Sequence, residues 1–290
     1  MSHPAHPDTV PARDPFPLRH RTALVTGASR RLGIGHAVAR QLAAFGASVY
    51  LHHHTPHDEE QPWGADPGGV QAVTDSVREV AAEGARVFDG PANLAAPDAP
   101  TQLVAEAAEA LGGRVDLLVA NHGLSGDDGP LDTLDAGMLD AHWAVNTRST
   151  VLLTQAFVRQ RRGARARDYR RGGADELPPG RVVFLTSGQD RRGGMPEEVA
   201  YALAKGALAS ITRTLATSLA EEGITLNTVN PGPVDTGYAE GEEHLAIARL
   251  FPRGRWGTPE EAARLIAWLC TDEADWITGE VINSEGGFAR

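Results

Sequence analysis

The sequence predicts a three-layer α/β sandwich, in which a doubly wound parallel sheet of seven strands carries helices on both faces. From Arg21 onward, short apolar runs alternate with segments of helical periodicity, as expected when each strand is followed by a helix that crosses back over the sheet. No internal repeat and no linker divides the chain after this point. We therefore expect a single domain over residues 21–290.

The predicted elements follow one another in the order that such a sheet requires. Continuous apolar runs typical of buried parallel strands occur at 22–26, 47–51, 85–90, 115–121, 181–186, 224–230 and 280–284. Helical periodicity covers about 34–45, 70–80, 98–112, 135–160, 208–219 and 259–270. In the first helix, for example, Ile34, Val38 and Leu42 share one face, and Gly46 ends the helix.

The bulk composition fits a globular protein and excludes several classes of function. Of the 290 residues, 41% are hydrophobic and 22% are charged. The formal net charge of −11 argues against nucleic-acid binding, which needs a basic surface. No apolar stretch reaches the length of a membrane span, and the single cysteine, Cys270, cannot form an internal disulfide. The proline-rich residues 1–20 lack the apolar centre of a signal peptide, so we expect a disordered arm and a cytoplasmic location.

The loops at the carboxyl ends of the strands carry the polar motifs, and ligands of doubly wound sheets bind at this edge. The first loop, "TGASRRLGIG" at 26–35, joins a strand to a helix, so its amides and the positive end of the helix can meet an anion. Glycine allows the backbone to approach a phosphate closely. Alone, this loop fits a damaged dinucleotide fingerprint, a different fingerprint, or an ordinary flexible turn.

Further motifs decide between these interpretations. They are Asn146 in "AVNTRS", Ser187 in "FLTSG", Tyr201 and Lys205 in "YALAK", and "NPGPVDT" at 230–236. In this combination and order, the chain from about Arg21 to Phe288 resembles the short-chain dehydrogenase/reductase family, which has a Rossmann-type fold. The family's glycine motif is T-G-x-x-x-G-x-G, and this chain carries two extra residues between Ser29 and Gly33.

The resemblance implies a catalytic tetrad of Asn146, Ser187, Tyr201 and Lys205. Tyr201 is then the proton donor in carbonyl reduction and the base in the reverse reaction. Lys205 is expected to lower the pKa of Tyr201, because a nearby positive charge stabilises the phenolate, and to hold the nicotinamide ribose. Ser187 is expected to hydrogen-bond the substrate oxygen, and Asn146 to hold a water that links Lys205 to solvent.

The resemblance also implies a nucleotide cofactor. The predicted cofactor-binding residues are Gly27, Ser29, Arg30, Arg31, Gly33, Ile34, His53, His54, Asn93, Leu94, Asn121, His122, Gly123, Tyr201, Lys205, Pro231, Gly232, Val234 and Thr236. The acidic residue of NAD-using members is replaced at His53, and Arg30 matches the arginine that meets the 2′-phosphate in NADP-using members, with Arg31 adjacent. We therefore favour NADP(H) over NAD(H). Gly35 is expected to permit close helix–sheet packing.

The histidines do not indicate a metal site. Adjacent strand residues point to opposite faces, so His52, His53, His54 and His57 cannot all converge on one ion, and no ligand spacing completes such a site. His122 replaces a small residue of the family pattern, and Asn93 replaces an aspartate. We interpret His122 and His142 as surface or packed histidines.

The implied reaction is hydride transfer between NADP(H) and a ketone or secondary alcohol, including 3-oxoacyl and polyketide-type carbonyls. Enoyl reduction is disfavoured, because enoyl reductases of the family space the tyrosine and lysine more widely. The alternative is an NAD(P)-binding regulatory or scaffold protein with vestigial catalysis. Substrate specificity is expected in residues 122–130, after Ser187, and in 237–254, which forms a short lid at most. Family members of this length usually form dimers or tetramers, so the resemblance implies a homo-oligomer.

Six arginines stand out in an acidic chain, at positions 161, 162, 165, 167, 170 and 171. One interpretation is a solvated loop that extends a helix. The other is a docking surface for an acidic partner such as an acyl carrier protein, or an oligomer contact.

Overall fold

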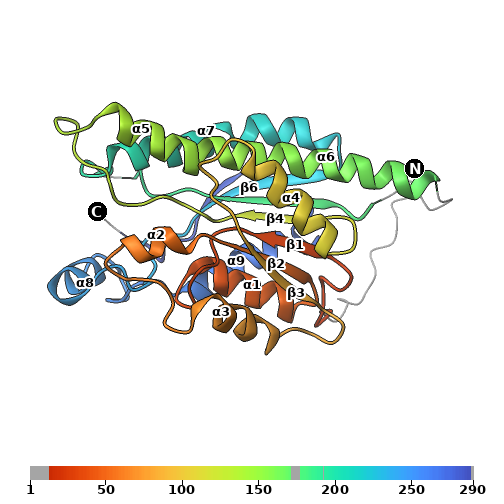
Figure 1. Ribbon diagram of the computed structural model, residues 1–290. Helices are drawn as coiled ribbons and strands as arrows, with labels where there is room; N and C mark the ends of the chain where they lie inside the picture. The colour runs from red at the N-terminus through yellow and green to blue at the C-terminus, as the bar shows by residue number, and fades with distance from the viewer. Residues whose placement is uncertain (1–12, 171–176, 192, 289–290) are drawn as a thin grey trace, which may run out of the picture.

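Figure 1 shows the computed structural model, which describes residues 13–170, 177–191 and 193–288. Within these residues, a parallel seven-stranded sheet has the order β3-β2-β1-β4-β5-β6-β7. The strands are β1 (Thr22–Val25), β2 (Ser48–His53), β3 (Val87–Pro91), β4 (Leu117–Ala120), β5 (Gly180–Leu185), β6 (Ile224–Asn230) and β7 (Val281–Asn283). The predicted doubly wound α/β fold is confirmed, because the strand order runs outward in both directions from the β1–β4 pair.

Helices cover both faces of the sheet (Figure 1). On one face lie α1 (Ile34–Ala44), α3 (Gly69–Arg78) and α9 (Pro259–Leu269), and on the other lie α4 (Ala99–Ala110), α6 (Ser149–Arg170) and α7 (Val199–Ala220). Short helices α2 (Thr55–Glu60), α5 (Ala136–His142) and α8 (Gly241–Ala248) follow the carboxyl ends of β2, β4 and β6, and a 3₁₀ turn spans Asp272–Ala274. Within the described part of the chain, no helix has both the length and the apolarity that crossing a bilayer requires.

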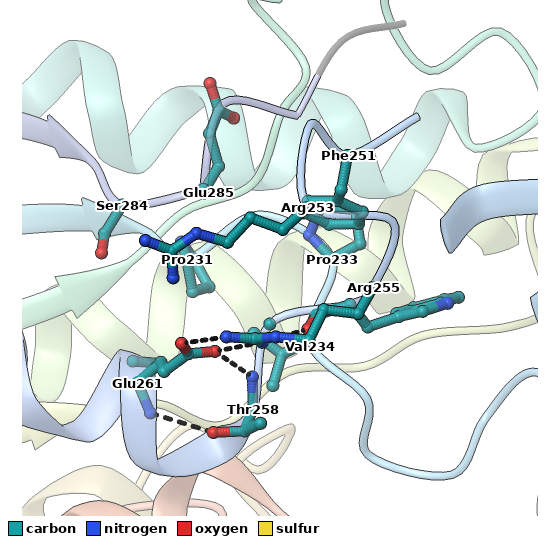
Figure 2. Close-up of a pocket in the computed structure, with 14 residues that line it drawn as sticks. Pro231, Pro233, Val234, Phe251, Arg253, Arg255, Thr258, Glu261, Ser284 and Glu285 are labelled. Carbon is teal, nitrogen blue, oxygen red and sulfur yellow. Dashed lines mark hydrogen bonds and ion pairs between the residues drawn. The ribbon is translucent and has the colours of Figure 1, made fainter. Parts of the chain in front are cut away.

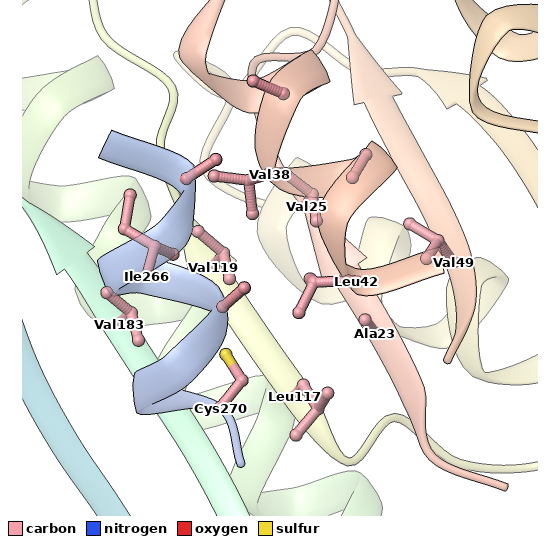
Figure 3. Close-up of a cluster of buried hydrophobic side chains, with 14 of the residues drawn as sticks. Ala23, Val25, Val38, Leu42, Val49, Leu117, Val119, Val183, Ile266 and Cys270 are labelled. Carbon is pink, nitrogen blue, oxygen red and sulfur yellow. The ribbon is translucent and has the colours of Figure 1, made fainter. Parts of the chain in front are cut away.

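Two apolar clusters hold the layers together, one on each face of the sheet. Val25 of β1 packs with Val38 of α1 and Ile266 of α9 in the first cluster (Figure 3). The neighbouring residue Leu24 belongs to the second cluster, with Phe157 of α6. Alternate residues of one strand thus serve opposite faces, which is why the central strands are apolar throughout. Each fully buried side chain of this size contributes about 1.5–3 kcal/mol.

The folded domain includes residues before the boundary that the sequence predicted. Leu18 is fully buried in the first apolar cluster. Its backbone N–H donates to the carbonyl of Phe45 at 2.9 Å, and its own carbonyl accepts from the N–H of Arg21 at 3.0 Å. The predicted disordered arm at 1–20 is therefore too long. Its last part packs on the domain, and its first twelve residues lie outside the described residues.

The helix predicted at 135–160 is longer than expected, and a π-helical segment interrupts its α-helical geometry. It runs from α5 through η1, a π-helical segment at Trp143–Arg148, into α6. Hydrophobic periodicity did not reveal the π-helical segment, because its wider turn spans only six residues.

The arginine-rich stretch is largely the end of α6 and not a loop. Arg161 is buried and its Nη1 lies 3.0 Å from Asp116 Oδ1, so a solvated position is wrong for this residue. Arg162 Nε donates to Glu222 at 2.9 Å. The side chains of residues 167 and 170, and the whole of Arg171, lie outside the described residues.

Candidate functional site

The main cavity lies where the strand order reverses, beyond the carboxyl ends of β1 and β4. It has a volume of about 750 Å³. The loops after the two strands are joined by Asn121, whose Nδ2 donates to the carbonyls of Thr26 and Gly27, both at 2.9 Å. Ligands of doubly wound sheets bind at this switch point, so the cavity is the candidate nucleotide site.

The glycine turn after β1 forms a cradle that side chains would fill. Gly27 has a φ of +71°, and a Cβ at this position would lie 2.7 Å from the Cα of His122. A Cβ on Gly35 would collide with the carbonyl of Gly27, as expected for close packing of α1 on the sheet. The turn therefore needs glycine at both positions, and it leaves backbone amides beside the cavity at the start of α1.

Most of the predicted cofactor-binding residues line this cavity. They are Gly27, Ser29, Arg30, Gly33, Ile34, His54, Asn93, Leu94, Asn121, His122, Gly123 and Thr236. Arg31 and His53 do not line it, because Arg31 Nη2 pairs with Asp66 at 2.8 Å and His53 Nε2 faces Asp89 at 3.4 Å. The sequence motifs did not select His52, which lines the cavity and accepts a hydrogen bond from the Gly27 N–H at 3.2 Å.

The loop after β6 separates the main cavity from a smaller one of about 340 Å³. Pro231 and Val234 line the smaller cavity, across which Arg253 extends (Figure 2). Gly232 has a φ of +65° and backs onto Glu285. Pro231, Gly232 and Val234 therefore do not line the main cavity, whereas Thr236 at the end of the same loop lines it.

The four side chains of the predicted tetrad lie together behind one wall of the main cavity. Gly123 forms this wall, and a Cβ on it would lie 3.2 Å from Lys205 Nζ and 3.3 Å from Asn146 Oδ1. Lys205 Nζ lies 5.8 Å from the centre of the Tyr201 ring. The Ser187 side chain acts on the Tyr201 phenol and lowers its pKa, and its Oγ donates to Met195 Sδ at 3.7 Å. Tyr201 and Lys205 themselves do not line the main cavity, because Gly123 lies between it and the lysine.

Lys205 is held by backbone carbonyls. Its buried Nζ donates to the carbonyl of His122 at 3.3 Å and to that of Leu185 at 3.2 Å. Burial lowers the pKa of Lys205 to about 8, because the charged form loses hydration. Lys205 is also the single lysine of the sequence, in which the other basic side chains are arginines and histidines.

The pKa of Tyr201 moves in the direction opposite to the one predicted. Burial raises it to about 12, the negative charge of Glu198 adds to the rise, and the Ser187 side chain opposes it. The predicted net lowering of this pKa is therefore wrong for this structure, because desolvation of the phenolate sets the direction and Lys205 is not among the causes of the shift. The phenol stays protonated at neutral pH, which suits a proton donor.

Asn146 lies in the π-helical segment and is bonded on both sides of its amide. Its Oδ1 accepts from the N–H of Leu124 at 2.7 Å, and its Nδ2 donates to the carbonyl of Leu124 at 3.1 Å. Nδ2 also lies 3.3 Å from Nδ1 of His142. Asn146 therefore fixes the loop after β4, and the predicted water would have to share these groups.

Two side chains near Tyr201 were not selected from the sequence. The carboxylate of Asp128 accepts from the backbone N–H groups of Ala200 at 3.0 Å and Tyr201 at 2.7 Å, at the start of α7. Burial opposes ionisation of Asp128, but these hydrogen bonds and one from Gly129 lower its pKa overall. The ring of His142 meets the Tyr201 ring edge-on, with 6.1 Å between centres.

His122 and His142 are both buried, in agreement with one of the two predicted alternatives. His122 Nδ1 lies 2.7 Å from Thr26 Oγ1, and its Nε2 lies 2.7 Å from Ser149 Oγ. Burial holds the pKa of His122 well below its usual range. The neutral ring thus links β1 to α6. Within the ranges that the structure describes, no group of three or more histidine, cysteine, aspartate or glutamate side chains is arranged to hold a metal ion.

Known proteins resemble this chain over nearly its whole length. A family model described as enoyl-(acyl carrier protein) reductase matches residues 27–289. An uncharacterized oxidoreductase of Bacillus subtilis is 38% identical over 272 residues, covering 94% of this chain and 98% of the relative. A 3-oxoacyl-(acyl-carrier-protein) reductase of Synechocystis is 32% identical over 275 residues, covering 93% and 97%.

A solved structure extends the likeness to three dimensions. A short-chain dehydrogenase from Burkholderia cenocepacia, in complex with NADP, superimposes with a TM-score of 0.76 at 32% identity, covering 93% of this chain and 98% of the other. The coverage shows that both likenesses span the whole domain. The chain belongs to the short-chain dehydrogenase/reductase family.

Proposed function

We propose that this protein is an NADP(H)-dependent oxidoreductase that reduces ketones to secondary alcohols and catalyses the reverse oxidation. One observation carries the proposal. The Tyr201 phenol lies close enough to Ser187 for that side chain to lower its pKa, and the Lys205 ammonium lies 5.8 Å from the centre of its ring, behind a cavity of nucleotide size. The membership in a family of oxidoreductases supports the same reaction class.

The residues around the main cavity fit a dinucleotide. The cradle at Gly27 and Gly35 allows a phosphate to approach the start of α1. Asn93 and Leu94 offer a polar and an apolar contact for a base, and Arg30 offers a cation for a 2′-phosphate. NADP in the Burkholderia cenocepacia relative supports the phosphorylated cofactor. When bound, the nicotinamide supplies the hydride that the carbonyl carbon accepts.

Each side chain of the tetrad has its own role in the transfer of the proton. Tyr201 donates its proton to the carbonyl oxygen as the C=O bond becomes a C–O single bond. Ser187 donates a hydrogen bond to the same oxygen while charge develops on it. Lys205, charged below a pKa of about 8, stabilises the resulting phenolate from one helical turn away. Asn146 keeps the loop after β4 against Lys205 through its two bonds to Leu124.

The substrate class that we favour is a 3-oxoacyl or polyketide-type ketone. The 3-oxoacyl-(acyl-carrier-protein) reductase of Synechocystis supports this class. The spacing of four between Tyr201 and Lys205 favours ketones over enoyl groups. A panel of ketones, acyl thioesters and enones, assayed for NADPH and NADH oxidation, tests both choices.

Tyr201→Phe tests the chemistry and separates it from the alternative of a regulatory or scaffold protein. We expect turnover to fall by about a thousandfold, because the proton donor is lost, while the Kd of NADPH stays within about threefold. Tyr50→Phe removes a hydroxyl from β2, away from the cavity, and serves as the matched control. Full activity in the Tyr201 variant would refute the assignment, and nucleotide binding without turnover on any carbonyl would favour the scaffold.

A homodimer or homotetramer belongs to the same proposal. Leu203 and Ile211 lie eight residues apart on α7, and both are exposed. Light scattering of the purified chain gives the mass of the assembly and tests this part independently of activity.

A further inference from the structure

The two arginines of the extended glycine turn have different surroundings. Arg31 is bound by the carboxylate of Asp66 through its Nε and Nη2 groups, at 2.8 to 3.1 Å, and it does not line the main cavity. Arg30 lines the cavity, and its Nη2 donates to the carbonyl of Thr236 at 2.8 Å. The turn therefore presents one arginine to the nucleotide and uses the other to anchor the loop that contains Asp66.

Arg30 already has an anionic partner inside the cavity wall. Its Nε lies 3.4 Å from Oδ1 of Asp58 in α2, and the two side chains are only 13% and 12% exposed. Trp63 completes the cluster, because its Nε1 donates to Asp58 Oδ1 at 3.3 Å and its ring lies 5.3 Å from the Arg30 guanidinium carbon. All three side chains line the main cavity.

The pairing of Arg30 with Asp58 is weaker than that of Arg31 with Asp66. It is a single contact at 3.4 Å, whereas the Arg31 pair has the forked geometry that makes guanidinium–carboxylate pairs strong. A phosphate monoester carries more negative charge than a carboxylate and offers three acceptor oxygens. A 2′-phosphate that reached Arg30 could therefore replace Asp58 as its partner.

We propose that Asp58 sets the cofactor selectivity of this protein by competing with the 2′-phosphate of NADP(H) for Arg30. This inference rests on the proposed function and names the residue that regulates its nucleotide site. Asp58 holds the guanidinium at the cavity wall in the free protein. The 2′-phosphate displaces the carboxylate, which then repels it from nearby, together with Glu60 on the same wall. The affinity for a 2′-phosphate is consequently lower than Arg30 alone would give.

Nucleotide fragments test the proposal without catalysis. Binding of 2′,5′-ADP and of 5′-ADP to the purified full chain is measured by titration calorimetry. We expect Asp58→Asn to tighten the binding of 2′,5′-ADP by about tenfold and to change that of 5′-ADP by less than about threefold. Glu59→Gln is the matched control, because it makes the same change of charge at an exposed position of α2 that does not line the cavity.

Arg30→Gln completes a double-mutant cycle with Asp58→Asn. We expect it to weaken 2′,5′-ADP by at least about tenfold and to abolish the gain from the Asp58 variant. An unchanged ratio of the two affinities in Asp58→Asn, or an equal gain in Glu59→Gln, overturns the role of Asp58. If 2′,5′-ADP fails to bind every variant, the cofactor assignment in the proposed function falls with it, so the two failures are distinguishable.

Trp63 gives a second measurement that leaves Asp58 in place. Displacement of Asp58 from Arg30 changes the surroundings of the Trp63 ring, so 2′,5′-ADP should alter the intrinsic fluorescence of the wild-type chain more than 5′-ADP does. Trp63→Phe should remove that difference. A fluorescence change of equal size with both nucleotides, or none with either at saturation, contradicts the displacement.

Discussion

The two halves of the cleft are held together by different means. In the catalytic half, Lys205 and Asn146 bind backbone groups, namely the carbonyls of His122 and Leu185 and the amide and carbonyl of Leu124. In the nucleotide half, side chains bind one another. Arg30 pairs with Asp58 of α2, and Arg31 pairs with Asp66 in the loop between α2 and α3.

This difference separates what must stay fixed from what a ligand can rearrange. Backbone groups near strand ends move little, because the sheet fixes them, so the positions of Lys205 and Asn146 are set by the fold itself. A pair of long side chains can exchange partners at a cost of a few rotamers. We therefore expect substitutions in the catalytic half to change the rate, and those in the nucleotide half to change affinity.

After Tyr201→Phe, the largest effect is expected for Lys205→Met. We expect the turnover for ketone reduction to fall by about a hundredfold or more, because the cation that stabilises the phenolate is lost. In the wild-type chain, the rate should decline as the pH rises through about 8, where Lys205 loses its proton.

The pKa of Lys205 can be measured apart from activity. Because the sequence contains a single lysine, labelling with ¹³C-ε-lysine gives one side-chain NMR signal, which should titrate near pH 8. A midpoint above pH 10 would show that the Lys205 amine is hydrated. It would contradict the buried contacts of Lys205 with the carbonyls of His122 and Leu185, on which the comparison of the two halves depends.

Mild acid should destabilise the folded protein, because His52 and His122 are buried in the uncharged form. Burial lowers the pKa of His52 to about 4 and that of His122 well below its usual range. Between pH 6.5 and these values, the unfolded chain binds more protons than the folded chain. The free energy of unfolding should therefore fall on acidification below pH 6.5, by up to about 1.4 kcal/mol per pH unit for each histidine, and be unaffected by them above it.

Urea denaturation at pH 7 and pH 5 measures this loss, and His122→Asn serves as the comparison. This variant lacks one of the two titrating groups, so its stability should depend less steeply on pH. An equally steep dependence would assign the acid sensitivity to other groups.

Asp128→Asn should have an intermediate effect, because Asp128 is a positioning residue and not a catalytic one. The variant weakens two charge-assisted hydrogen bonds to the start of α7, so we expect kcat to fall by about tenfold with little change in KM, and stability to fall by about 1 kcal/mol. Asp127→Asn changes the exposed neighbour and is the control. A rise in KM with unchanged kcat would place Asp128 in substrate binding instead.

The smallest effect is expected at the arginine-rich end of α6. Arg161 and Arg162 already pair with acidic side chains of this chain, and Arg165 interacts electrostatically with Glu222. Arg165→Glu should therefore change the KM for a carrier-bound 3-oxoacyl thioester by less than about twofold at low salt. An increase of tenfold that disappears at high salt would show that the segment docks an acidic carrier.

The sequence predicted the parts of the molecule that depend on local spacing. Tyr201 and Lys205 share a helix face because they are four residues apart, and strand ends place Ser187 and Gly27 at one edge of the sheet. The seven strands could also be located from local sequence, because each strand coincides with a short apolar run.

The parts that depend on distant partners could not be predicted in this way. Asp58 and Asp128 are two of 38 acidic residues, and nothing near them in the sequence names Arg30 or the start of α7 as their partner. The rise in the pKa of Tyr201 likewise depends on how deeply the tertiary structure buries the phenol.

The wide turn at Trp143–Arg148 has a consequence for any attempt to simplify the protein. A π-helical turn is equivalent to one residue inserted into an ordinary helix, and each residue of a helix advances the rotation by roughly 100°. Deleting one residue here would make the long helix regular, yet it would swing α5 around the helix axis and carry His142 away from the phenol. The fold therefore requires the π-helical segment, and a redesign that idealises the backbone should keep it.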